Sequence, residues 1–250
     1  MADACAVLAF HAVEAGPGPL CIAPTIFDRQ IRALHGSGYV AISVADVARH
    51  IREQEPFPDR SVAITFDDGY ESVHRWAWPV LDSVGYRATV FPVTGELGGY
   101  NRWDADAGTA PRMALLSPSQ VTELSDAGWE IGGHTHSHRP LPGRPHGEVV
   151  EELHRSGAVL AELCGRPVET FAYPYGRHDA TSRRLTAAAY LASATIGARR
   201  ARLSSALDRV ERVDAWYLQR PWQARHLNDW VGAGYLGFRR LGRALGGHLK

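Results

Sequence analysis

Short apolar runs rich in β-branched residues alternate along the chain with segments whose apolar residues recur at helical spacing. The runs predict strands at 7–10, 61–66, 87–93, 129–132, 168–173 and 210–213. The segments predict helices at 27–34, 44–53, 72–84, 118–127, 147–163 and 182–192, followed by a helical tail from Ala224 onward. Repeated strand–helix units predict a parallel sheet, and right-handed crossovers would wind it into a barrel or an open, doubly wound sheet.

Single residues mark where several of these helices begin, bend or end. Ser117 is expected to cap the helix that follows it, and Gly128 and Gly165 stand just past the ends of two others. Pro79 is expected to kink the helix that contains it. The glycine-rich connection over residues 94–112 is long enough to suggest a functional loop.

The composition is that of an ordinary globular protein. The 250 residues are 45% apolar and 22% charged, and 27 basic side chains balance 27 acidic ones. Because the composition changes nowhere abruptly, we expect one domain over residues 1–250. The zero net charge argues against nucleic acid as a partner and favours a neutral or mixed substrate.

The cysteines and the N-terminus predict a compartment. Cys5, Cys21 and Cys164 form no CxxC pair and share no metal-ligand spacing, which favours buried or free thiols in a reducing environment. The N-terminal segment has neither a basic leader nor a long apolar run, so a cytoplasmic protein is expected.

Two adjacent carboxylates, Asp67 and Asp68, directly follow an apolar strand and precede Gly69. In parallel α/β folds the carboxyl ends of strands line the active site, and a glycine there lets both side chains face one cleft. An ordinary Asp-Asp-Gly turn is the alternative.

Three histidines, His134, His136 and His138, occupy five positions after a short predicted strand. One helical turn or a tight loop would bring the rings of His134 and His138 together. A solvated histidine-rich loop is the alternative, since the chain has twelve histidines. With one carboxylate, the two rings form a donor set that suits Zn²⁺, Fe²⁺, Co²⁺ or Ni²⁺ and leaves room for water and substrate. The second carboxylate would accept a proton from the attacking water.

Aromatic residues suggest a substrate groove. The strand over 168–173 runs into Tyr173, Pro174 and Tyr175, which form a possible groove wall with an exposed backbone N–H. In the glycine-rich loop, Trp103 offers a flat face on which a sugar can stack, although ordinary loop packing is as good an explanation. His11, at the end of the first strand, is a further candidate for chemistry.

Three motifs, the Thr-Phe-Asp-Asp-Gly of 65–69, the His-Thr-x-x-His of 134–138 and the Phe-Ala-Tyr-Pro-Tyr-Gly of 171–176, occur in this order. Together they resemble the polysaccharide deacetylases with a NodB-type domain, carbohydrate esterase family four. The resemblance covers Val7 to Val213, and the first two motifs in combination are specific. It implies an α/β fold, a distorted (β/α) barrel of parallel strands, and a metal-dependent hydrolase that removes an N-acetyl group from a carbohydrate.

The resemblance also implies roles for the matching residues. The general base matches Asp67, and the ligands of one divalent ion, zinc before cobalt, nickel or iron, match Asp68, His134 and His138. Tyr175 matches the residue whose backbone N–H faces the developing oxyanion, and Thr135 matches the residue that steadies the histidine loop.

The chain departs from the family pattern in two places. The third motif usually carries an arginine where this chain has Ala172, and Arg212 is expected to orient the base instead. The usual C-terminal motif that supplies the catalytic acid is absent. The segment around His11 resembles a subgroup in which a histidine of the first strand is the acid, and Asp214 is expected to tune it.

Several alternatives remain open at this level. The fold also hosts hydrolases of other C–N bonds, such as formamides and cyclic ureides, and a two-histidine, one-carboxylate set also occurs in non-haem Fe(II) oxygenases. A non-catalytic carbohydrate-binding protein is a further reading. The carbohydrate could be a polysaccharide, a glycolipid or a small glycoconjugate. The stretch from Trp230 to Leu249 mixes aromatic residues, leucine and arginine and could contact a membrane surface.

Overall fold

The computed structural model describes residues 2–229 and 231–238, in which two parallel strands form the centre of the sheet. β1 (Ala4–Phe10) pairs with β3 (Ser61–Asp68) in parallel from Ala6↔Val62 to Phe10↔Phe66. All residues of both strands are buried, which explains the continuous apolar run of β1 and the apolar residues at 62–64 and 66 of β3.

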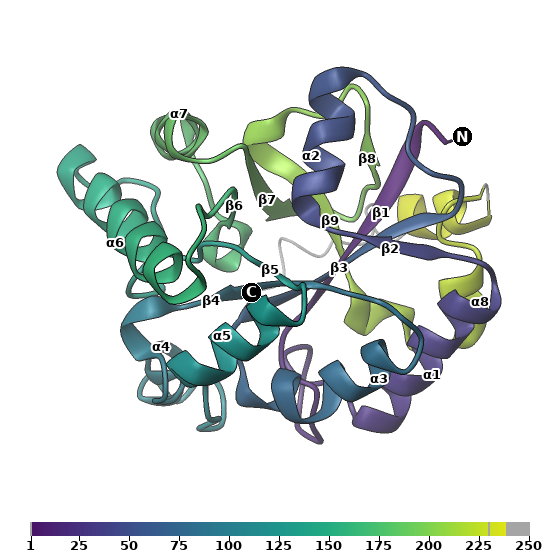
Figure 1. The fold of residues 1–250 in the computed structure, drawn as a ribbon, viewed down its shortest axis with the longest axis horizontal. Helices are drawn as coiled ribbons and strands as arrows, with labels where there is room; N and C mark the ends of the chain where they lie inside the picture. Colours follow the sequence, from purple (N-terminus) through teal and green to yellow (C-terminus); the bar gives the residue numbers. More distant parts are fainter. Residues whose placement is uncertain (1, 230, 239–250) are drawn as a thin grey trace.

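The remaining parallel strands extend the sheet on both sides of these two (Figure 1). They are β4 (Thr89–Pro92), β5 (Glu130–Ile131), β6 (Thr170–Ala172), β7 (Ala192–Ile196) and β9 (Val210–Asp214), in the spatial order β5-β4-β3-β1-β9-β7-β6. A parallel bridge between Gly133 and Phe171 joins the two ends of this order. The sheet thus closes into the (β/α) barrel that the sequence predicts.

The barrel is distorted because its central strands change neighbours along their length. On one edge of β3, β2 (Val40–Ile42) pairs with residues 61–63 and β4 pairs with residues 65–68. On the outer edge of β1, β8 (Ala201–Arg202) pairs antiparallel with residues 4–5, and β9 pairs with residues 8–9.

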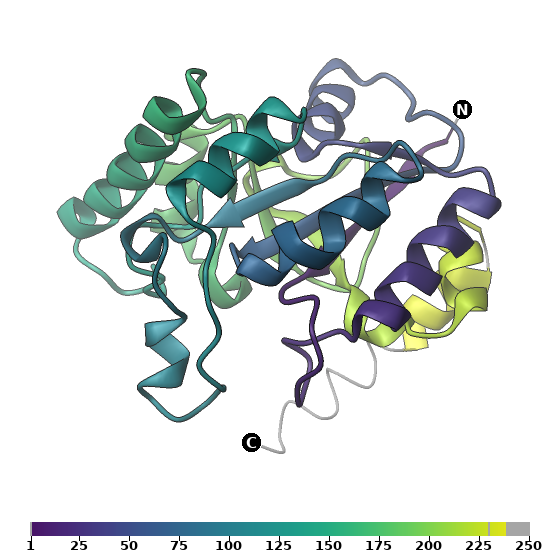
Figure 2. The same ribbon diagram turned by 60° about the horizontal axis from the view of Figure 1, so that its bottom comes forward.

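Helices surround the barrel, with α6 and α7 at the left of Figure 1 and α1 and α8 at the right. The helices are α1 (Pro24–Gly36), α2 (Val44–Glu53), α3 (Trp78–Asp82), α4 (Arg102–Ala105), α5 (Pro118–Asp126), α6 (His146–Cys164), α7 (Ala180–Ala189) and α8 (Pro221–Arg225). Figure 2 shows the blue-green connection that carries α4 projecting from the lower edge of the molecule, beside the purple loop that follows β1.

The predicted helix ends are confirmed at α5 and α6, where a capping side chain or a glycine ends the helix. The Ser117 hydroxyl accepts a hydrogen bond from the Gln120 N–H and caps α5, and the Ser117 N–H donates in return to the Gln120 side-chain oxygen. Gly165 ends α6 in the left-handed conformation, and Gly128 follows α5 with φ of 85°.

The sequence interpretation was wrong for several boundaries. The single helix expected over 72–84 begins as a π-helical turn, η1 (Val73–Ala77), and continues as α3. Pro79 explains this, because it has no N–H and its ring needs space from the preceding turn. β2, β7 and β8 were not predicted. The predicted helix over 182–192 included the alanine-rich start of β7, whereas α7 ends at Ala189.

Only part of the helical tail predicted from Ala224 onward falls within the described residues. Residues 231–238 are helical, whereas Trp230 and residues 239–250 lie outside the described residues, and with them most of the stretch expected to touch a membrane. Among the residues described, no helix combines the length and the apolar character needed to cross a bilayer. The three cysteines are free thiols, as expected.

Candidate active site

The carboxyl end of β3 brings two buried carboxylates to the rim of the barrel. Asp67 and Asp68 are 4% and 3% exposed. The chain turns sharply after them, because Asp68 and Gly69 both adopt positive φ angles, 69° and 75°. A side chain at Gly69 would place its Cβ 2.7 Å from the Cβ of Pro92 on the neighbouring strand, so only glycine fits this turn.

The histidines are held by a tight loop after β5 rather than by a helical turn. Thr135 and His138 have positive φ angles of 65° and 58°, and the Thr135 hydroxyl accepts a 2.9 Å hydrogen bond from the His138 N–H. The Nδ1 of His134 lies 2.7 Å from the Ala172 carbonyl oxygen. Since a carbonyl only accepts, Nδ1 carries the proton, and the Nε2 lone pair of His134 faces the site.

Asp68, His134 and His138 converge on one point. The Asp68 Oδ1 lies 3.2 Å from His134 Nε2 and 3.1 Å from His138 Nε2. One donor atom from each of the three residues lies within 4.8 Å of the others, and all three side chains are buried. Two nitrogens and a carboxylate oxygen gathered in this way fit a divalent transition-metal ion.

The electrostatics of this group favour a cation. Burial raises the pKa of Asp68, but His138 and His134 outweigh it, and the pKa lies well below its usual value. Burial lowers the pKa of His134, but the hydrogen bond to Asp68 and the charges of Asp67 and Asp68 outweigh it and raise that pKa. The negative charge that favours a proton on His134 equally attracts a metal cation.

Backbone strain is concentrated in this region. Of the seven described non-glycine residues with positive φ, four are Asp68, Thr135, His138 and Tyr175. A left-handed conformation costs a non-glycine residue roughly 1–2 kcal/mol. Strain of this kind persists where the surrounding structure holds a functional geometry in place.

Asp67 is paired with Arg212 of β9. The guanidinium donates from Nη1 to Asp67 Oδ1 and from Nη2 to Oδ2, each at 2.6 Å, and Nη1 also donates to the Thr65 hydroxyl at 3.0 Å. Arg212 is 0% exposed. Burial raises the pKa of Asp67, but Arg212 and His134 outweigh it, so the pKa lies below its usual value. Arg212, which the sequence analysis expected to orient Asp67, thus contacts that carboxylate directly.

His11 follows β1 and lies near both carboxylates. Its side chain is half-buried, and its buried Nδ1 has no hydrogen-bond partner among the residues described. Burial raises the pKa of Asp67 and Asp68, whereas His11 is one of the groups that lower it. The β1–β9 register places Asp214 beside Ala9, two positions before His11, and Asp214 accepts a 3.0 Å hydrogen bond from the Trp216 N–H.

Aromatic side chains cover His138 from two directions. The ring centroids of Trp103, on α4, and Tyr175, after β6, lie 4.4 Å and 4.7 Å from that of His138. The Tyr175 hydroxyl donates to Asp104 at 3.3 Å, which links the α4 connection to the loop after β6. The glycine-rich loop therefore forms part of the site wall.

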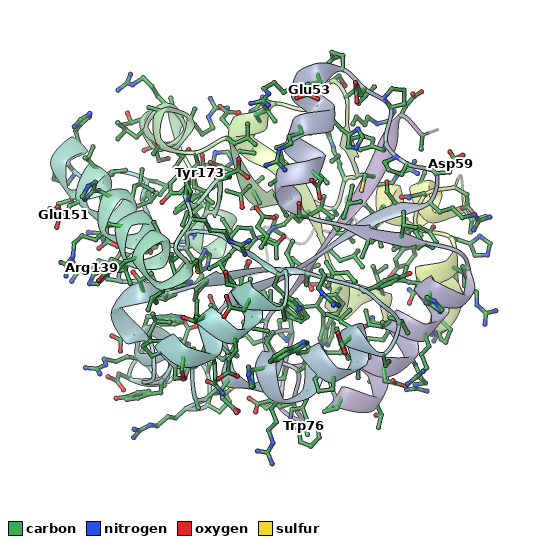
Figure 3. All side chains as sticks on the ribbon, in the orientation of Figure 1. Glu53, Asp59, Trp76, Arg139, Glu151 and Tyr173 are labelled. Carbon is green, nitrogen blue, oxygen red and sulfur yellow. The ribbon has the colours of Figure 1, made fainter. Side chains whose placement is uncertain are left out.

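The prediction that Tyr173 and Pro174 line a substrate groove is wrong, because both residues are buried. The Tyr173 hydroxyl lies 2.6 Å from the Thr186 hydroxyl and donates to the Asp208 carbonyl oxygen at 2.8 Å. Figure 3 places Tyr173 within the body of the protein, whereas Trp76 and Glu151 lie at its periphery. The Tyr173 side chain packs the barrel wall rather than lining a groove.

Two residues near the site were missed by the sequence analysis. Glu152 of α6 accepts hydrogen bonds from the backbone N–H groups of His136 and Ser137, both at 2.9 Å, and so anchors the histidine loop. Tyr70 has a fully buried ring, and burial together with the charge of Asp68 raises the pKa of its hydroxyl. Helical periodicity marks Glu152 only as a polar position, so no sequence signal reveals this contact.

The comparisons with known proteins agree with this geometry. The family profile "Polysaccharide deacetylase" matches residues 54–193. The chain is 27% identical over 159 residues to a poly-beta-1,6-N-acetyl-D-glucosamine N-deacetylase of Staphylococcus aureus, and 24% identical over 173 residues to YxkH of Bacillus subtilis. These alignments cover 60% and 69% of the chain. The chain spans little more than half the length of these relatives, 52% and 57%.

Solved structures share the fold. IcaB from Ammonifex degensii has a TM-score of 0.76 and 27% identity, and the match covers 89% of this chain and 97% of that one. The Streptococcus pyogenes deacetylase PplD, solved with acetate, has a TM-score of 0.74 at 23% identity, covering 88% and 98%.

The fold is a (β/α) barrel whose strands carry the buried Asp68, His134 and His138 cluster at their carboxyl ends. The chain belongs to the polysaccharide deacetylase family. His11, Arg212 and Asp214 lie outside the range that the family profile matches.

Proposed function

We propose that this protein is a metal-dependent N-deacetylase that acts on an N-acetylhexosamine unit of a carbohydrate. The observation that carries the proposal is the buried set of Asp68, His134 and His138 beside a second, separately paired carboxylate, Asp67. Hydrolysis of an amide needs both an electrophile-activating site and a base, and this arrangement offers one of each.

Asp68, His134 and His138 would hold one divalent ion, with zinc the first expectation. When bound, such an ion supplies Lewis-acid activation of a carbonyl group and of water. The Ala172 carbonyl orients the His134 ring, and the Thr135 hydroxyl holds the backbone of His138. Ligands oriented in this way bind metal more tightly than free ones.

The protein's own groups divide the proton transfers. Asp67, kept ionised by Arg212, accepts a proton from the attacking water. The backbone N–H of Tyr175 donates a hydrogen bond to the oxyanion that develops on the acetyl carbonyl. His11 then gives a proton to the departing amine nitrogen, and Asp214 supports it. Trp103 shields the site and offers its ring to the sugar.

Family membership and fold favour a hydrolase over the iron oxygenase. Experiment must identify which C–N bond the protein hydrolyses. The Staphylococcus aureus relative, named for poly-beta-1,6-N-acetyl-D-glucosamine, makes an N-acetylglucosamine polymer the first substrate to test. A formamide remains the alternative, because the same residues would serve a smaller acyl group.

The test combines metal analysis with acetate release. The purified protein is assayed with N-acetylglucosamine oligomers, single N-acetyl sugars, nucleotide sugars and matched formamides, before and after treatment with a chelator. We expect about one metal ion per chain, acetate release that stops with the chelator, and recovery with zinc, cobalt, nickel or iron. Metal-free protein of unchanged activity would refute the proposal.

A further inference from the structure

Tyr70 places a buried hydroxyl beside the proposed metal site. Its ring is fully buried, and its hydroxyl oxygen is buried with it. That oxygen has no hydrogen-bond partner among the residues described. The large majority of buried polar side-chain atoms do have a partner, and a buried donor without one lowers stability. The hydroxyl therefore costs the folded protein stability unless a group that binds at the site makes use of it.

The backbone around Tyr70 is fixed to the end of the connection that carries α4. The Leu116 N–H donates to the Gly69 carbonyl oxygen at 2.7 Å, and the Glu71 N–H donates to the Ala114 carbonyl oxygen at 2.9 Å. These two hydrogen bonds lie on either side of Tyr70. Tyr70 is therefore held in place at the carboxyl end of β3, where the proposed metal ligands meet.

The Asp68 carboxylate acts on this hydroxyl. Asp68 precedes Tyr70 by two positions, and the turn at Gly69 separates them. Burial raises the pKa of the Tyr70 hydroxyl, and the negative charge of Asp68 raises that pKa further. Among the charges that act on the hydroxyl, that of Asp68 has the largest effect, ahead of that of Asp104. The phenol O–H and the carboxylate therefore lie close together in the buried part of the site.

Other groups of the site have partners that orient them. The Ala172 carbonyl accepts a hydrogen bond from the His134 ring, and Arg212 binds both oxygens of Asp67. The contacts of Asp68 run instead from its Oδ1 to the two histidine rings, at 3.1 Å and 3.2 Å. A metal ion would bind these same atoms, so they cannot also orient the carboxylate. Carboxylates that bind metals in proteins are usually themselves held by a hydrogen-bond donor.

We infer that the Tyr70 hydroxyl is the donor that orients the Asp68 carboxylate as a metal ligand. A phenol keeps its proton at neutral pH and can donate it to a carboxylate oxygen. The inference rests on the proposed deacetylase function and adds a positioning residue to its metal site. A hydroxyl that lowers the stability of the metal-free protein thus strengthens the binding of the ion.

The first measurement is zinc affinity, which does not depend on turnover. Wild type, Tyr70→Phe and a control, Tyr86→Phe, compete with a chromophoric chelator for zinc. Tyr86 is also buried, but it precedes β4, and its hydroxyl donates to the Tyr39 carbonyl oxygen at the end of the barrel opposite to the site. The dissociation constant of zinc should rise about 10- to 100-fold in Tyr70→Phe and stay unchanged in the control. Equal affinity in Tyr70→Phe and wild type would overturn the inference.

The second measurement is thermal unfolding of the metal-free proteins. Tyr86→Phe removes a hydrogen bond and should lower the thermal midpoint. Tyr70→Phe removes an unsatisfied group and should leave the midpoint equal to that of wild type or higher. If Tyr70→Phe lowered the midpoint as much as the control does, the hydroxyl would serve the fold and the inference would be wrong.

The third measurement is acetate release at different zinc concentrations. Release by Tyr70→Phe should be low in limiting zinc and recover in excess zinc, because Tyr70 positions a ligand and transfers no proton. A loss that excess zinc does not restore would contradict the positioning role. If the wild type bound no metal ion, the metal-dependent deacetylase would be refuted and the inference with it. Zinc binding that the substitution leaves unchanged would overturn the role of Tyr70 alone.

Discussion

Arg212 holds Asp67 through two 2.6 Å hydrogen bonds, although 145 positions separate the two residues in the chain. Both side chains are buried, so neither charge has access to water as a substitute partner. The arginine therefore has two effects on the carboxylate. It keeps Asp67 ionised, which a base requires, and it fixes the direction in which the carboxylate oxygens point.

Replacing Arg212 with methionine should damage both stability and catalysis. The change leaves the buried Asp67 carboxylate without its partner, and breaking a buried ion pair in this way typically costs about 3–5 kcal/mol of unfolding free energy. Acetate release should fall at least about 100-fold, because the base loses its orientation. Urea denaturation and a rate assay measure the two effects.

The double variant Asp67→Asn/Arg212→Met separates the effect on stability from the effect on catalysis. With both charges removed, most of the lost stability should return, while acetate release stays low. If the double variant were as unstable as Arg212→Met alone, the unpaired charge would not be the cause.

Replacing Asp67 with asparagine alone should remove the base and keep the ligand set. We expect a rate lower by roughly 10²–10⁴-fold with metal content unchanged, as measured by elemental analysis. Asp68→Ala provides the comparison, since it should lose both metal and activity. Full activity in Asp67→Asn would show that another group accepts the proton.

Replacing His11 with alanine should harm amide hydrolysis more than ester hydrolysis. An amine must be protonated as it leaves, whereas 4-nitrophenolate leaves without a proton. The rate on the N-acetyl sugar should fall roughly 10²–10⁴-fold, and the rate on 4-nitrophenyl acetate should fall far less. Equal losses on both substrates would indicate that His11 shapes the site and is not the acid.

Glu130, at the opposite end of the barrel, should make stability depend on pH. Burial raises the pKa of its carboxyl above the ordinary 4.5, although hydrogen bonds from Thr170, Thr89 and the Ala45 N–H oppose this. The folded state thus keeps the proton to higher pH than the unfolded chain does. The stability that Glu130 contributes is complete below the ordinary pKa and declines as pH rises through the folded one.

Replacing Glu130 with glutamine removes this titration and retains a side chain able to bond both threonines. Thermal midpoints of wild type and variant are measured from about pH 4 to about pH 7. The midpoint of wild type should fall relative to that of the variant as the pH rises. Parallel curves would show that burial at Glu130 has no energetic effect.

The sequence predicted most of the fold and the centre of the site, because both depend on local patterns. The apolar run ending in Asp67 and Asp68 marked the strand end, and the spacing of His134 and His138 marked the ligand loop. The placement of Arg212 beside Asp67 was anticipated only from the absence of the usual arginine. No local pattern states that β9 and β3 each lie next to β1.

Other features depend on register and packing that sequence does not encode locally. Tyr173 and Tyr175 are two positions apart in one motif, yet one packs the wall and the other lies against His138. The short turn that separates them, with positive φ at Tyr175, decides which side chain faces the site.

The barrel closes through an isolated bridge at Gly133, and the next residue is His134, one of the three proposed metal ligands. The His134 ring also hydrogen-bonds to the carbonyl oxygen of Ala172 on β6, the strand on the other side of this bridge. The contact that closes the barrel therefore also positions a residue of the proposed metal site. Breaking the bridge between Gly133 and Phe171 would move His134 away from Asp68. Barrel closure and catalysis should therefore be lost together.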